Sequence, residues 1–433
     1  MTDRAIAGSA TALIETPRAN LWTRAFYGMG QVVTEPSDLY FGFVLRAAGE
    51  APALEDLRRH VAQRMVHVPV LTYRLEADGS GITWVRNENF DIRDHVQAGV
   101  LPEPGRSPAQ TLLARGASLP LWGMWLVPVA DENRWELHYL THHAVQDAAG
   151  AIRTLQILLG DEEPRAIAAA SRSGATASVL RALAVAPDLL STYRPGLVRP
   201  SPPAPAGSPR SLAYAQVPTG VLKAIARTRR ATVNQVHLGA MAIALDNLDR
   251  ERTGSPVPRS GRPTYVAVPV DTRVDGEPDG PIGNHLGLIR VPLPSGSPSP
   301  ATALDSVIRS THTRRLAQWR RFWHEVSHGR AEWLAARALP RIVDPLRSAF
   351  TVSGLNINGQ VVWRGEPFHE ILPLPWFPLG GSCFTLSASY RGTTTMSVLG
   401  HGGPFEPQRL AVLWKEAAFE LERALVPGEP HRS

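Results

Sequence analysis

The sequence predicts an α+β protein made of two halves, each a mixed β-sheet with helices, that form a cleft or tunnel between them. Three observations lead to this fold class. The length of 433 residues exceeds the size at which a single hydrophobic core keeps growing. Strand patterns and helical spacings occur in both halves of the chain, as in mixed α and β layers. A proline-rich stretch at residues 192–210 divides the chain near its middle.

The proline-rich stretch sets the predicted domain boundaries. It contains six prolines in nineteen residues, and such a segment sustains neither a helix nor a central strand. We therefore predict an N-terminal half at residues 1–191, a crossover linker at 192–210 and a C-terminal half at 211–433.

The N-terminal half is expected to alternate short strands and helices. Aromatic and branched residues at 39–47 are typical of a strand, and apolar residues three and four apart at 54–66 are typical of a helix. The other expected elements are extended pieces at 71–75, 83–86 and 90–96, a helix at 109–115, strands at 122–129 and 135–140, and a helix at 149–159.

The C-terminal half has a comparable inventory. A strand at 211–217 is followed by helices at 219–228 and 232–248, the second with a clear helical spacing of apolar residues. The remaining expected elements are strands at 265–270 and 286–293, a largely helical region at 301–348, strands at 349–357, 360–363 and 384–398, and a closing helix at 408–425.

Composition narrows the functional classes. The net charge is +6 and the pI about 9.8, but the basic residues are scattered, which argues against nucleic acid and allows an acidic partner such as a phosphorylated cofactor. Cys383 is the only cysteine, so an intrachain disulfide and a multi-thiolate metal site are excluded. We find no signal peptide or membrane span, and expect a cytoplasmic protein, with peripheral contact at the inner membrane or lipid droplets left open.

One segment carries candidate chemistry. Residues 142–147 read His-His-Ala-Val-Gln-Asp and follow an alternating apolar strand, a junction where catalytic groups are commonly placed. A neutral imidazole can take a proton from a hydroxyl or amine near neutral pH. Asp147 would hold the loop through an ion pair with Arg153 or Arg273.

The sequence gives less support to a metal site, a serine hydrolase site or a nucleotide-binding loop. Zinc binding by the histidines at 138, 142 and 143 is disfavoured, because the segment is predicted as strand and turn and lacks a His-Glu-x-x-His pattern. The sequence has no Gly-x-Ser-x-Gly elbow and no phosphate-binding glycine loop. Cys383 is interpreted as a buried, inert thiol.

Four landmarks of the N-terminal half occur in a familiar order. Residues 84–96 read Trp-Val-x-x-x-x-Phe-Asp-Ile-x-x-His-Val, 101–105 Leu-Pro-Glu-Pro-Gly, 120–122 Pro-Leu-Trp and 142–147 His-His-x-x-x-Asp. Together they resemble the bacterial wax ester synthase/diacylglycerol acyltransferase family, which is related to peptide synthetase condensation domains and to chloramphenicol acetyltransferase. The likeness continues, more thinly, at 231–236, 268–273, 283–294 and 389–392, and so spans about residues 20–425.

The resemblance implies two chloramphenicol acetyltransferase-like halves and direct acyl transfer, without a covalent acyl-enzyme. The donor would be acyl-CoA as a cosubstrate, or an acyl carrier protein thioester, and the acceptor a hydroxyl or amine of a small molecule or lipid. No bound cofactor or metal is implied. His143 would be the general base, His142 mainly structural, and Asp147 would shape the loop, with Arg273 from the other half as its better partner. Further residues implied are Asn234, Gly283 and Asn284 as support of the site, and Pro120, Leu121 and Trp122 in substrate binding.

Departures from the family pattern leave the acceptor open. Ala148 stands where a glycine usually follows the aspartate, at a loop position that can require positive φ, and Gln235 replaces the acid of an Asn-Asp pair. A lipid acceptor and a specialised metabolite remain alternatives. A different class of function also remains, a binding protein that keeps the condensation-domain-like fold without turnover.

Overall fold

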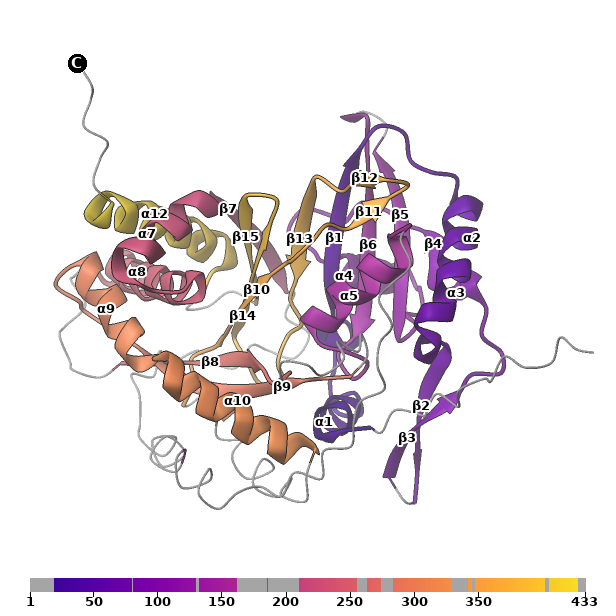
Figure 1. Cartoon of the computed structure of the whole chain (residues 1–433), viewed down its shortest axis with the longest axis horizontal. Helices are drawn as coiled ribbons and strands as arrows, with labels where there is room; N and C mark the ends of the chain where they lie inside the picture. The colour runs from indigo at the N-terminus through magenta and orange to yellow at the C-terminus, as the bar shows by residue number, and fades with distance from the viewer. Residues whose placement is uncertain are drawn as a thin grey trace, which may run out of the picture.

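The computed structural model describes residues 19–79, 81–129, 132–161, 185, 210–254, 263–273, 283–328, 339, 342–344, 347–401 and 405–426. The predicted linker at 192–210 lies outside these ranges except for its last residue, so the domain boundaries stay a prediction. Figure 1 shows the described elements as two sheets with helices packed around them.

The N-terminal sheet has five strands, in the order β13 (Glu370–Leu374), β1 (Tyr40–Ala48), β6 (Arg134–His142), β5 (Trp122–Val129) and β4 (Val96–Ala98). Strands β4 and β5 are parallel and the other neighbours antiparallel, so the sheet is mixed. The alternating apolar strands predicted on either side of residue 131 form the β5–β6 pair.

The C-terminal sheet has six strands, in the order β7 (Ser211–Pro218), β15 (Thr393–Gly400), β14 (Cys383–Tyr390), β10 (Thr351–Asn356), β8 (Thr264–Asp271) and β9 (Leu286–Leu293). Strand β10 runs parallel to both of its neighbours, and the remaining pairs are antiparallel. The α+β fold with two mixed, sheet-containing halves is therefore confirmed.

Most of the helices lie where the sequence predicts them, those at Leu21–Met29 and Ile92–His95 excepted, and sequence-encoded caps set several of their ends. Ser107 and Gln110 form a capping box at one helix, and Thr232 and Gln235 form another. In the N-terminal half the helices are α1 (Leu21–Met29), α2 (Leu54–Arg64), α3 (Ile92–His95), α4 (Pro108–Ala114) and α5 (Ala148–Leu159). In the C-terminal half they are α7 (Thr219–Arg229), α8 (Val233–Thr253), α9 (Pro300–Ser310), α10 (Thr313–His328) and α12 (Pro407–Leu425).

Smaller pieces complete the described elements. They are the hairpins of β2 (Tyr73–Asp78) with β3 (Gly81–Arg86) and of β11 (Val362–Trp363) with β12 (Glu366–Pro367), and three 3₁₀ turns at Pro36–Leu39, Met65–His67 and Pro69–Thr72. Residues 90–96, expected as an extended piece, instead contain α3, because Asp91 caps a helical turn there. Within the described part of the chain, none of the helices is long and apolar enough to span a bilayer.

Strand β13 joins the two halves, and the sequence patterns did not predict it. It lies between β10 and β14 of the C-terminal sheet along the chain, yet pairs with β1 at the edge of the N-terminal sheet (Figure 1). Pro373 opposes Phe43 in this pairing, and an edge is where a sheet tolerates proline. Strand β9, within the family-like stretch at 283–294, pairs with β8 in its own half, and Gly283, just before it, forms a bridge to Gln146 of the N-terminal half.

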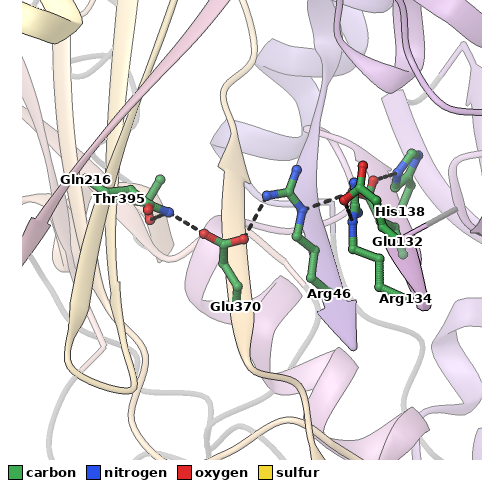
Figure 2. Close-up of polar contacts among 8 residues, drawn as sticks. Arg46, Glu132, Arg134, His138, Gln216, Glu370 and Thr395 are labelled. Atoms are coloured by element: carbon green, nitrogen blue, oxygen red, sulfur yellow. Dashed lines mark hydrogen bonds and ion pairs between the residues drawn. The ribbon is translucent and has the colours of Figure 1, made fainter. Parts of the chain in front are cut away.

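A polar network ties β13 to both sheets (Figure 2). Arg46 on β1 donates to Glu370 at 2.8 Å and to Glu136 on β6 at 2.9 Å. Glu136 also pairs with His138 at 2.8 Å, and Gln216 of the C-terminal sheet donates to Glu370. Charged groups are rarely buried without partners, and here each partner helps to keep β13 in register.

Candidate active site

The segment 142–147 lies where the two halves meet. Strand β6 ends at His142, and Asp147 caps the N-terminus of α5 by accepting a hydrogen bond from Gly150 N at 2.8 Å. Between them the chain bonds to Gly283 of the C-terminal half: Gly283 N donates to Val145 O at 2.8 Å. The candidate residues are therefore held by backbone contacts from both halves.

His143 has a defined tautomer. Its Nδ1 lies 3.2 Å from Asn284 Oδ1, while Asn284 Nδ2 donates to the His143 carbonyl at 2.8 Å. Because the amide nitrogen is used by the carbonyl, the amide oxygen faces the ring, and Nδ1 must carry the hydrogen. The lone pair of the neutral ring then lies on Nε2, the nitrogen that could accept a proton.

Aromatic rings surround the His143 imidazole. Phe26 on α1 stacks on it at 3.8 Å between ring centroids, Phe41 on β1 lies tilted at 4.8 Å, and Trp376, just after β13, is perpendicular to it at 5.0 Å. Burial is the largest influence and lowers the pKa of His143 to about 4, against the opposing effects of Asp147 and Asn284. The imidazole is thus neutral at pH 7 and competent to act as a base.

His142 has a different environment. Its Nδ1 accepts a hydrogen bond from Ala144 N at 3.1 Å, and its ring lies edge-on to Tyr40. Burial first, and His143 second, lower the pKa of His142 to about 4. Bound in this way, His142 stabilises the turn that presents His143.

Asp147 is fully occupied by partners other than the imidazole. Its Oδ1 accepts from Gly150 N and from Arg273 at 2.9 Å, and its Oδ2 accepts from His285 N at 2.8 Å. Burial alone would raise the pKa of Asp147, but Arg273 and these hydrogen bonds hold it below its usual value. Arg273 comes from the end of β8, so the pair is a buried tie between the halves, and Arg153 has no part in it.

The remaining predicted site residues differ in how close they lie to residues 142–147. Gly283 has a φ of +93°, which explains a glycine there. Asn234 is exposed at the start of α8, beside Gly354 of β10, and makes no described hydrogen bond with residues 142–147. Leu121 O accepts from His142 N at 2.8 Å.

Trp122 is a core residue. Its side chain is 1% exposed, its Nε1 donates to Leu71 O at 2.9 Å, and its ring stacks on His95. This burial gives it a packing role. The substrate-binding role of Pro120, Leu121 and Trp122 stays a prediction.

The two departures from the family pattern are accommodated locally. Ala148 is the first residue of α5 and does not have positive φ, so the position does not need glycine. Gln235 completes the capping box of α8 and donates from Nε2 to Thr311 O at 3.1 Å. Both residues fit without disturbing the contacts of His143.

The sequence patterns did not predict the aromatic neighbours Phe26, Phe41 and Trp376 of His143, nor Asn20, as site residues. All four lie far from the His-His segment in sequence, and α1 itself was not predicted. Its signal was present: Asn20 is a favourable N-cap, and the buried Trp22 and Phe26 follow at helical spacing. Within the described ranges, no group of three or more His, Cys, Asp or Glu side chains could hold a metal ion.

Comparison with known proteins gives a consistent picture. Residues 39–241 match the wax ester synthase/diacylglycerol acyltransferase catalytic domain family. A Mycobacterium tuberculosis protein provisionally named a diacylglycerol O-acyltransferase is 26% identical over 393 residues, 78% of this chain and 76% of the relative. Another, from the same organism and named likewise, is 28% identical over 138 residues, so that the match spans only 30% of that relative's length.

Solved structures support the fold. The wax ester synthase/diacylglycerol acyltransferase from Marinobacter aquaeolei VT8 superposes with a TM-score of 0.57 at 17% identity, covering 94% of this chain and 99% of that one. The first condensation domain of the calcium-dependent antibiotic synthetase gives 0.66 at 16% identity, covering 95% and 96%. These identities are low, and the match establishes a shared chain fold.

Proposed function

We propose that the chain is a divergent member of the wax ester synthase/diacylglycerol acyltransferase family and acts as an acyltransferase with His143 as its general base. It would move an acyl group from a thioester to a hydroxyl acceptor, or to an amine. The supporting observation is the hydrogen bond between His143 Nδ1 and Asn284 Oδ1, which leaves the lone pair on Nε2.

The reaction needs one proton shuttle. Nε2 of His143 takes the proton of the acceptor O–H or N–H as the acceptor atom attacks the thioester carbonyl. The C–S bond then breaks, and the imidazolium returns the proton to the departing thiolate, so that an ester or amide and a free thiol leave. No acyl group is attached to the protein at any stage.

The other residues would act as a scaffold. Asn284 keeps the imidazole in its productive tautomer, and the Asp147–Arg273 pair holds the catalytic turn against β8. The role of Asn234 as a support of the site stays a prediction, since it stands exposed at the start of α8 beside Gly354. We place the substrates between the two halves, because the candidate base is built from both.

The donor is proposed to be acyl-CoA, with a carrier-protein thioester as the alternative. One structural neighbour, the starter condensation domain of rhizomide synthetase, was solved in a complex with C8-CoA and Leu-SNAC. The acceptor is either a lipid alcohol such as diacylglycerol or a specialised metabolite. The reaction would take place in the cytoplasm, with contact at the inner membrane or lipid droplets if the acceptor is a lipid.

The test is a thioester-consumption assay. Purified protein is mixed with acyl-CoAs of several chain lengths and a panel of diacylglycerols, long-chain alcohols and amines, with free thiol and acylated product both measured. His143→Ala should lower turnover by about 10² to 10⁴-fold, the contribution of a lost general base. His369→Ala, at an exposed position, is the matched control and should keep wild-type turnover.

Two results would count against the proposal. Wild-type turnover preserved in His143→Ala would remove the general base. No thioester consumption by the wild type with any acceptor, from CoA or from carrier protein, would favour the binding-protein alternative.

A further inference from the structure

Helix α1 places an aromatic face directly on the candidate base. The rings of Phe26 and His143 are 3.8 Å apart between centroids and inclined by only 15°. Carbon atoms in contact are separated by about 3.5–4.0 Å, so at this spacing the face of Phe26 overlaps the imidazole in van der Waals contact.

The stacked contact of Phe26 differs from the other ring contacts of His143. Phe41 is tilted against the imidazole by 46° and Trp376 by 83°, whereas Phe26 is inclined by 15° and presents its face. An aromatic ring carries a negative face, and a cation over that face is attracted to it. The Phe26 contact is therefore placed to stabilise an imidazolium when one forms.

The charge balance around His143 points the same way. A base that accepts a proton in a dry site needs a partner for the positive charge. Asp147 favours the charged ring, but only from a distance, because its two oxygens bind Arg273, Gly150 N and His285 N. Asn284 offers a dipole and no net charge. Of the groups in contact with the ring, Phe26 has the geometry to interact with the charge itself.

We propose that the face of Phe26 stabilises the imidazolium of His143 through a cation–π contact, which makes α1 a positioning element of the acyl-transfer site. This inference rests on the proposed function, because the imidazolium forms only if His143 takes the acceptor's proton. Phe26 contacts the imidazole of His143 and not the substrate, so it would act on the reaction through His143.

Helix α1 is anchored so as to hold Phe26 in place. Asn20 caps the helix by accepting from Thr23 N, and its Nδ2 donates to the Asn284 carbonyl at 2.9 Å. On the other side, Trp22 Nε1 donates to Ser327 of α10 at 3.1 Å. The helix is thus tied both to the residue that orients the base and to the C-terminal half.

The experiment replaces Phe26 with mono-, tri- and pentafluorophenylalanine in the full-length protein. Fluorination keeps the shape of the ring while weakening and then reversing the charge of its face. We expect kcat to fall stepwise, to about a tenth of wild type or less for the pentafluoro ring, in line with a desolvated cation–π contact. The acid limb of the pH profile and the pKa of His143, followed by NMR of labelled histidine, should shift downward along the series.

Three further substitutions separate charge from packing. Pentafluorophenylalanine at Phe405, a fully buried ring that packs on Phe350, should leave kcat unchanged. Phe26→Trp, which retains an aromatic face, should keep more activity than Phe26→Leu.

The outcomes distinguish this inference from the proposed function. The cation–π proposal is wrong if kcat stays within twofold of wild type across the fluorinated series and the pKa of His143 does not shift. This holds whatever reaction the protein catalyses. A loss of kcat without any change in that pKa or in the pH profile would mean that Phe26 only packs, and would also overturn it. If instead His143→Ala keeps wild-type turnover, the proposed function fails, and the fluorinated series still reports on the contact through the NMR titration.

Discussion

The neutral state of the His143 imidazole follows from its enclosure by three aromatic rings. Burial lowers its pKa to about 4, so the ring stays unprotonated over a wide pH range. A general base is active in its unprotonated form, and its activity is lost as pH falls through the pKa.

We therefore expect kcat/KM to be nearly constant from pH 8 down to about pH 5, and to fall only as pH approaches about 4. The measurement is a pH series of initial rates with subsaturating thioester, with stability checked at each pH by return to pH 7. An acid limb centred near the ordinary histidine value of about 6.5 would contradict a buried base.

Asn284 should matter as much for rate as for structure. Its side chain is fully buried and bonds to both the ring and the carbonyl of His143. Asn284→Leu keeps the size but leaves Nδ1 without an acceptor, so the wrong tautomer competes. We expect kcat to fall by about 10²-fold, with a smaller change in KM.

Asn284→Asp restores an acceptor for Nδ1 and should recover part of that loss, which tests the tautomer directly. Steady-state kinetics of both variants, with circular dichroism as the control for folding, provide the comparison. Equal rates for wild type and Asn284→Leu would remove the tautomer argument.

At the scale of elements, the predictable parts of the site are those with local signals. Strand β6 alternates apolar residues, and Asp147 is a favourable N-cap for α5, so both were placed correctly to within two residues. Arg153 and Arg273 were both candidate partners of Asp147, and the preference for Arg273 came from the resemblance, because nothing local in the sequence relates residues 126 positions apart.

Strand β13 and helix α1 were not predicted from the sequence. The prolines at 373 and 375 argue against a strand, and only the edge position explains why one of them is tolerated. Residue 376, which follows that strand, then contacts His143. Pairing between distant segments is a tertiary effect, and local propensity cannot reveal it.

The ion pair of Asp147 and Arg273 should contribute strongly to the free energy of unfolding. Both side chains are about nine-tenths buried, and removal of one partner leaves a buried charge unpaired. We expect Arg273→Met to lower the free energy of unfolding by about 3–5 kcal/mol. Asp147→Asn combined with Arg273→Met should recover part of this loss, measured by urea unfolding as a double-mutant cycle.

The pair of Arg229 and Asp305 is the matched control for this cycle. Its side chains are about one-third exposed and 3.7 Å apart, so its coupling should be about 0–1 kcal/mol. Equal coupling in the two pairs would show that burial of the Asp147–Arg273 tie does not matter.

At the scale of the whole molecule, the site depends on contacts that cross between the two halves. The largest hydrophobic core includes Trp22, Phe26 and Val145 together with most of the C-terminal sheet. The network around Glu370 adds a polar connection at β13 (Figure 2). The halves are therefore expected to unfold together, and a titratable group buried in one half should affect the stability of both.

His237 is such a group. It lies in the C-terminal core on α8, edge-on to Trp414, and neither ring nitrogen has a hydrogen-bond partner within the described residues. Burial lowers its pKa to about 4, below the 6.5 of a free histidine. Between these two pH values His237 is protonated in the unfolded chain but not in the folded protein. The free energy of unfolding therefore falls as pH falls from about 6.5 towards 4.

His237→Phe removes this proton uptake and also two unsatisfied nitrogens. We expect the variant to be at least as stable as wild type at pH 7.5, and to lose about 1–2 kcal/mol less between pH 7 and pH 5. Urea unfolding at a series of pH values measures both, and His369→Phe, at an exposed position, should reproduce the wild-type pH dependence. Because His142 and His143 are also buried with lowered pKa values, the variant should retain part of the acid sensitivity. If the free energy of unfolding of His237→Phe depended on pH as in the wild type, His237 would be protonated, or reached by water, in the folded protein.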